Sequence, residues 1–134
     1  MQLVSVRVIT NDVPRLVEFY EQVTGLAARR PAEQFAEFVG PACTLAIGSV
    51  ETMALFSPGA AVPESNRTAV LEFLVDDVDR EHERLAGLAV VPEVVQEPTT
   101  MPWGNRSLLF RDPDGNLVNF FTPVTDGARA RLGG

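Results

Sequence analysis

A chain of 134 residues is long enough for one domain with a buried core, and its composition, 46% hydrophobic and 22% charged, is that of a globular protein. Eleven arginines and no lysine face eighteen acidic residues, so the formal charge of −7 makes nucleic acid and anionic lipid poor partners. One cysteine, no signal-peptide pattern and no apolar run of the ~18 residues that a membrane span needs predict a cytoplasmic protein.

The first half of the chain predicts a strand, a helix and three more strands. Alternating apolar residues predict a strand over 3–10, and Asp12 then offers a cap for a helix that Gly25 ends. Short apolar runs between turn signals predict the remaining strands at about 34–40, 43–48 and 51–57. The order of elements in this half is therefore βαβββ.

The same order begins again after a turn-rich linker at 57–65. Alternation predicts a strand over 70–76, and Asp77 caps a helix that Gly87 ends. Further strands are expected at about 90–96, 105–111 and 116–122. The tail, 124–134, has no hydrophobic period and is expected to be mobile.

The two halves match when the second is moved back by 65 positions. The first strands then coincide, with Arg7 on Glu72, and the helix caps coincide, with Asp12 on Asp77. The same offset places Ala54 on Asn119 near the end of each half. We therefore expect an internal duplication within one domain over 1–123, with module one at about 1–58 and module two at about 66–123.

Three stretches in order resemble the glyoxalase I, bleomycin-resistance protein and extradiol-dioxygenase group, the vicinal oxygen chelate superfamily. They are Asp12 through Phe19-Tyr20 to Gly25-Leu26, then Val75-Asp76-Asp77-Val78, and finally Pro102–Arg106 followed by Asp112–Leu117. The resemblance covers residues 1–123. It implies an α+β fold in which two βαβββ modules form a half-open, U-shaped mixed β-barrel with the helices outside and the ligand site on the concave face. It also implies a homodimer.

Metal-dependent members of that family carry up to four His, Glu or Gln ligands, which the resemblance maps onto Ser5, Ala54, Val70 and Asn119. Valine and alanine have no donor atom, and a serine hydroxyl or an asparagine carbonyl is a weak ligand. The only histidine, His82, lies on the helix stripe that faces the sheet. We therefore expect no catalytic metal and no cofactor.

The cavity is expected to be lined by the odd-numbered positions of the first strand and their equivalents, because the even positions pack against the first helix. Such a lining is mostly apolar with few polar groups, as in small-molecule sites, although the same residues could form a closed core. The residues predicted to bind a ligand are Arg7, Phe56, Glu72, Trp103, Leu109, Asn119 and Phe121.

Three of these residues have two interpretations each. Arg7 and Glu72 either pair with each other and fix the barrel floor, or one of them meets a charged or polar ligand, since a charge in an apolar interior needs a partner. Trp103 either stacks on a planar ligand at the cavity rim or anchors a surface loop.

The leading hypothesis is a metal-free small-molecule binding protein, similar to the bleomycin-resistance branch, that sequesters a cationic aromatic drug or metabolite. The acidic surface and the absent metal ligands agree with it. The alternative is a metal-independent enzyme, a lyase or isomerase, in which Glu72 is the general acid or base and Arg7 stabilises an anion. A third possibility is an interaction module that has lost its ligand.

Overall fold

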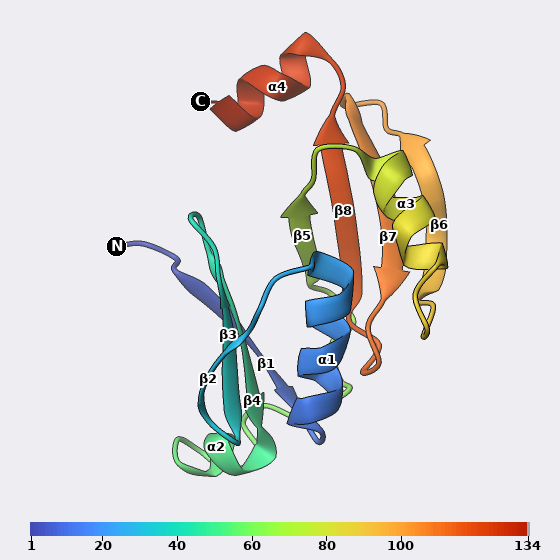
Figure 1. The fold of residues 1–134 in the computed structure, drawn as a ribbon. Coiled ribbons are helices and arrows are strands. Elements are labelled where there is room, and N and C mark those ends of the chain that lie inside the picture. Colours follow the sequence, from blue (N-terminus) through green and yellow to red (C-terminus); the bar gives the residue numbers. More distant parts are fainter. Residues whose placement is uncertain (134) are drawn as a thin grey trace. The chain divides into compact units, whose positions relative to one another are not determined.

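A computed structural model of the chain describes residues 1–133 and divides it into two compact units, one over residues 1–66 and one from Arg67 onward. Each unit contains one four-stranded mixed sheet with its own helices (Figure 1). Residues 1–133 contain no helix that is long and apolar enough to cross a membrane.

The first unit contains β1 (Ser5–Thr10), α1 (Val13–Thr24), β2 (Arg29–Ala32), β3 (Phe35–Val39), β4 (Thr44–Ser49) and α2 (Val50–Ala54). Its strands are ordered β1-β4-β3-β2, with β1 parallel to β4 and the other pairs antiparallel. The second unit contains β5 (Val70–Leu74), α3 (Val78–Ala86), β6 (Glu93–Thr100), β7 (Asn105–Arg111), β8 (Leu117–Pro123) and α4 (Asp126–Gly133). Its order is β5-β8-β7-β6, with β5 parallel to β8.

The two units therefore repeat one topology, which confirms the predicted α+β fold of two βαβββ modules. The first strand of each unit lies at one edge of its sheet, next to the last strand of that unit. Both sheets are open, and open sheets are compatible with the half-open barrel that the sequence predicts.

The long helix of each unit begins and ends where the sequence predicts. The Asp12 side chain accepts a hydrogen bond from the Arg15 amide at 3.1 Å, and Asp77 accepts one from the Arg80 amide at 3.0 Å. These bonds satisfy amides that the first turn of a helix leaves without partners. Gly25 ends α1 with a φ of 72°, a left-handed conformation that glycine adopts without strain.

In the first unit, α1 covers the face formed by the even positions of β1. Val6 faces Leu45 across the β1–β4 pair, and Leu45 faces Phe38 across the β4–β3 pair. The Phe38 ring lies 6.2 Å from the ring of Tyr20 on α1. The predicted orientation of β1 is thus confirmed, and Arg7 lies on the face opposite the helix.

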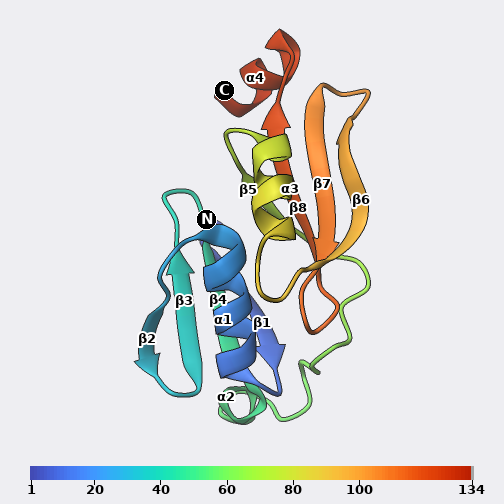
Figure 2. The ribbon, with the colours of Figure 1, turned by 45° about the vertical axis from the view of Figure 1, so that its right-hand side comes forward.

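In the second unit, α3 lies against one face of its sheet, as Figure 2 shows. An aromatic cluster forms the core beneath it. The Phe120 ring packs edge-to-face on Phe110 at 4.9 Å and on Phe73 at 5.7 Å. Phe120 and Phe110 are fully buried, so this cluster anchors the two central strands, β7 and β8.

The predicted strand at 51–57 is wrong, because residues 50–54 form the short helix α2. Ser49 caps this helix: its hydroxyl accepts a hydrogen bond from the Thr52 amide at 3.3 Å, and its carbonyl accepts one from the Thr52 hydroxyl at 2.6 Å. The strand that completes the four-stranded sheet is instead β2, which the sequence analysis missed because Arg29–Ala32 has no apolar alternation. Ala54 therefore does not lie on a last strand.

The chain after β8 forms α4, whereas the sequence predicted no regular structure there. Thr125 caps this helix by accepting a hydrogen bond from the Ala128 amide at 3.1 Å, and Ala128 is buried. Gly104, with a φ of 93°, lies so close that a side chain there would collide with the Thr125 hydroxyl. The buried side chain that holds this helix is the small Ala128. A single small residue gives no hydrophobic periodicity, so the sequence analysis could not detect the helix.

Candidate functional site

Cross-strand register establishes which positions of the two units are equivalent. Arg7 faces Ala46 across the β1–β4 pair, and Glu72 faces Asn119 across the β5–β8 pair. Arg7 and Glu72 are therefore equivalent, as predicted, but the counterpart of Asn119 is Ala46 and not Ala54. The 65-residue offset holds for the first strands and fails for the last strands, because the helices, strands and loops between them differ in length.

The corrected alignment leaves the metal-ligand positions of the family without a suitable donor set. Ala46 has no more capacity to bind a metal than Ala54, and Ser5 and Val70 supply no imidazole or carboxylate. Within residues 1–133, no group of three His, Cys, Asp or Glu side chains is placed to hold a metal ion. The residues present do not fit the metal that the fold family uses.

The face of the second sheet opposite α3 is the best candidate for a ligand surface. Its central cross-strand row is formed by Glu72, Asn119 and Leu109. The flanking rows on this face contain Val70, Leu117 and Arg111 on one side and Leu74, Phe121 and Ser107 on the other. On β5, β8 and β7 this face therefore places the Glu72 carboxylate and the Asn119 amide beside apolar side chains, and such a mixture is found in small-molecule sites. The Arg111 guanidinium of the flanking row donates a hydrogen bond to the Gly115 carbonyl at 3.0 Å.

Glu72 and Asn119 are joined by a hydrogen bond in which the amide nitrogen of Asn119 donates to the Glu72 carboxylate at 2.8 Å. An ionised carboxylate only accepts hydrogen bonds, so this contact fixes which end of the amide faces Glu72. The amide oxygen of Asn119 then points away, and it is buried without a hydrogen-bond partner among residues 1–133. A buried acceptor left in this way costs about 1–3 kcal/mol.

The predicted site residues Leu109 and Phe121 lie on this face. Leu109 is the register partner of Asn119 on β7, and Phe121 follows Asn119 by two residues on β8. Phe121 also faces Leu74 across the β5–β8 pair. Both side chains therefore lie beside the Glu72–Asn119 pair, as the period-two pattern of the strands implies.

Trp103 lies at the other end of the same sheet. It precedes Gly104, whose carbonyl accepts a hydrogen bond from the Val124 amide at 2.8 Å. Val124 lies five residues after Asn119 along the chain. At ~3.3 Å per strand residue, that separation is about 17 Å. Trp103 is 55% exposed, and its backbone carbonyl accepts a hydrogen bond from Arg131 on α4. A shared ligand of Trp103 and Glu72 stays a prediction.

Arg7 has its own surroundings in the first unit. Its guanidinium carbon lies 5.0 Å from the centre of the Phe35 ring and 5.3 Å from that of the Phe56 ring. Phe56 was predicted on a strand, but it follows α2 and still reaches Arg7. Phe35 was missed, although it occupies an odd position of a predicted strand and so belongs to the same face. The predicted Arg7–Glu72 pair stays a prediction.

The ion pair between Arg106 on β7 and Asp79 on α3 lies on the helix side of the second sheet. Two hydrogen bonds join them, from the guanidinium Nε at 2.8 Å and from Nη2 at 2.9 Å. The hydrogen bond from Arg106 lowers the pKa of Asp79 below its ordinary value of 3.8, and the same bond raises the pKa of Arg106. This pair fastens α3 to the sheet and takes no part in the opposite face.

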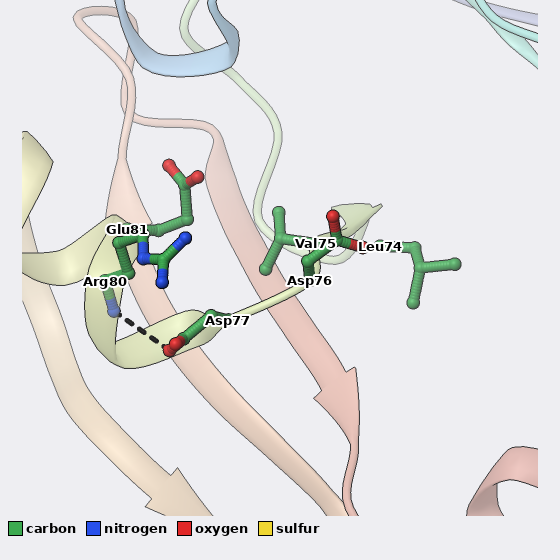
Figure 3. Close-up of a pocket in the computed structure, with 6 residues that line it drawn as sticks. All are labelled: Leu74, Val75, Asp76, Asp77, Arg80 and Glu81. Carbon is green, nitrogen blue, oxygen red and sulfur yellow. Dashed lines mark hydrogen bonds between the residues drawn. The ribbon is translucent and has the colours of Figure 1, made fainter.

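A hollow of about 290 Å³ lies where β5 leads into α3. Its lining is Leu74, Val75, Asp76, Asp77, Arg80 and Glu81, drawn in Figure 3. The Asp77 carboxylate is occupied as the cap of α3. Except at Leu74, the hollow shares no residue with the Glu72 face. Its volume is just below the range of ~300–1,000 Å³ that small-molecule sites occupy.

Comparison with known proteins agrees with this fold. The family model described as the Glyoxalase/Bleomycin resistance protein/Dioxygenase superfamily matches residues 2–120. The "Uncharacterized protein YraH" of Bacillus subtilis (strain 168) is 30% identical over 127 residues, which cover 90% of this chain and 98% of YraH. A solved glyoxalase/bleomycin resistance protein/dioxygenase from Nocardioides has a TM-score of 0.76 and 25% identity, over 95% of this chain and 86% of its own. A family enzyme from Burkholderia phytofirmans PsJN has a TM-score of 0.78 and 19% identity, over 92% and 100% of the two chains.

Proposed function

The chain belongs to the glyoxalase/bleomycin resistance protein/dioxygenase superfamily, and we propose that within it the protein binds a small molecule without a metal. The ligand carries N–H donors on a cationic group attached to an apolar or aromatic body. One observation carries the proposal: Glu72 and Asn119 join in the central row of this sheet face beside Leu109, and the Asn119 amide oxygen has no partner within residues 1–133.

The chemistry of the pair selects for a donor. Glu72 offers acceptor oxygens only, and the one group of Asn119 that lacks a bond is also an acceptor. A cationic N–H group can donate to the exposed Glu72 carboxylate, and charge-assisted bonds are the stronger kind. Leu109 and Phe121 exclude water from one side of such a contact, and the net charge of −7 attracts a cation over a longer range.

Benzamidine tests this proposal, because it presents a planar cationic N–H group on an aromatic ring. Calorimetric titration should show saturable binding that Glu72→Gln weakens by about 1–3 kcal/mol, or roughly 5- to 150-fold in Kd. Glu18→Gln is the matched control, since it removes the same charge from the exposed side of α1. Trimethylphenylammonium, a cation without N–H donors, should bind more weakly than benzamidine.

Two results would contradict the proposal. Equal weakening by Glu18→Gln and Glu72→Gln would mean that only the overall charge attracts the probe. Tighter binding of benzoate than of benzamidine to this face would reverse the sign of the recognised group and would count against sequestration of a cationic drug or metabolite.

The enzymatic alternative needs Glu72 and Arg7 to act on one substrate, and the two residues belong to different units. Within its own unit Glu72 is held by Asn119, and Arg7 lies over two phenyl rings. No contact described above favours proton transfer over simple binding. Catalysis therefore stays a prediction, which the formation of product from a bound compound would support.

A further inference from the structure

We propose that Arg7 forms a second recognition site, in the first unit, for the carboxylate of an aromatic or apolar molecule. All the residues that form it belong to the first unit. Arg7 projects from β1, an edge strand of its sheet, on the face that α1 leaves open. Its guanidinium group lies over the rings of Phe35 and Phe56, at 5.0 and 5.3 Å from their centres.

The ring contacts leave the hydrogen-bonding edge of Arg7 available. In the part of the chain that the structure describes, Arg7 has these two ring contacts but no hydrogen bond and no ion pair. A cation–π contact uses the face of the guanidinium group, whereas all five of its N–H bonds lie in the plane. Two parallel N–H bonds at that edge match the two oxygens of one carboxylate.

No acidic neighbour on the same sheet face takes that place. Glu37 lies in the same cross-strand row, but its register partner is Ala46, so strand β4 separates it from Arg7. Two strand spacings amount to about 10 Å between backbones. The side chain of Arg7 instead lies close to Gly48, where an added Cβ would be 3.7 Å from Arg7 Cδ. Arg7 is thereby positioned by rings and backbone and not by a counter-charge.

The surroundings favour a monoanion with an apolar body. Arg7 is the only basic residue on β1 and β4, and the chain has a net charge of −7, so a single cation balances a carboxylate better than a phosphate dianion. Phe56 is 70% exposed, so its ring offers an apolar surface beside the bound carboxylate. A ligand ring can cover that surface and remove it from water.

Titration with sodium benzoate, followed through the Nε–H resonance of Arg7 by NMR, tests the proposal. We expect a saturable shift of that resonance, with weaker binding of phenylphosphonate and none of benzyl alcohol. Arg7→Gln should weaken benzoate binding, measured by calorimetry, by about tenfold or more. Arg30→Gln removes the same charge from β2, at the opposite edge of the same sheet, and should change the affinity less than twofold.

Arg7→Lys keeps the positive charge and loses the planar fork, so it tests the geometry even if Arg7→Gln folds poorly. It should also weaken benzoate binding severalfold. If Arg7→Lys bound benzoate as tightly as the unchanged protein does, the proposal would be overturned, because positive charge alone would then suffice. An Arg7 resonance that stays unchanged at millimolar benzoate, or equal losses in Arg7→Gln and Arg30→Gln, would overturn it as well.

Discussion

Replacing Asn119 by leucine should stabilise the protein while weakening its ligand binding. Asn119 is 8% exposed, and its amide oxygen is buried without a partner within residues 1–133. Leucine has a similar size and removes that acceptor, which relieves about 1–3 kcal/mol. The same change removes the hydrogen bond from Asn119 to Glu72. That bond is worth roughly 0.5–1.5 kcal/mol, because Glu72 is exposed and its carboxylate can bond to water instead.

The net expectation is a gain of about 1 kcal/mol in the free energy of unfolding, or roughly 3–5 °C in Tm for a chain of this size. Urea denaturation followed by circular dichroism measures the gain directly. Benzamidine affinity should fall in the same variant, because the Asn119 amide no longer orients the Glu72 carboxylate. Gained stability with lost binding is the pattern expected of a polar group kept for function.

Asn116→Leu is the matched control, since Asn116 is a buried asparagine of the same unit whose amide group is bonded. Its side-chain nitrogen donates to the Asp112 carboxylate at 2.8 Å, and its backbone amide donates to the same carboxylate at 2.9 Å. Leucine there should lower the free energy of unfolding by about 2 kcal/mol. If Asn119→Leu destabilised the protein as much as Asn116→Leu, the Asn119 oxygen would have a partner and the reasoning would be refuted.

Further expectations follow from the same structure. Protein purified without chelator should contain well under one equivalent of zinc, iron, nickel or manganese, and stoichiometric metal that survives dialysis would contradict the assigned donor set. We propose a homodimer, because open sheet edges and an apolar face favour association, so light scattering should give twice 14.6 kDa and a strictly monomeric mass would contradict it. Asp79→Asn should lower Tm slightly at neutral pH. Because folding lowers the Asp79 pKa, this stabilisation exists above the unfolded value of 3.8 and disappears as pH falls through the lower folded value. The two proteins should therefore melt alike at about pH 2, and an undiminished difference there would contradict the role of the charge.

Local signals in the sequence were sufficient for α1, α3 and the duplication, although they missed α2 and α4. Asp12 and Asp77 cap their helices, and Gly25 ends α1, because capping depends only on residues within one turn. Strand β7 coincides with the predicted range, since its turn residues and its alternation agree. The equivalence of Arg7 with Glu72 also came from the sequence, because the first strand and the first helix of both modules have the same spacing.

The tertiary structure decided what depends on contacts between distant segments. Residues 50–54 have enough apolar character for a strand, but the Ser49 cap and the pairing of β4 with β1 make them a helix, which moves the counterpart of Asn119 to Ala46. The separation of Trp103 from Glu72 follows from cross-strand register, which no single strand encodes. The same holds for the bond between Glu72 and Asn119 and for the rings around Arg7. Composition and periodicity place a side chain on a face, whereas its partners are set by the neighbouring strands.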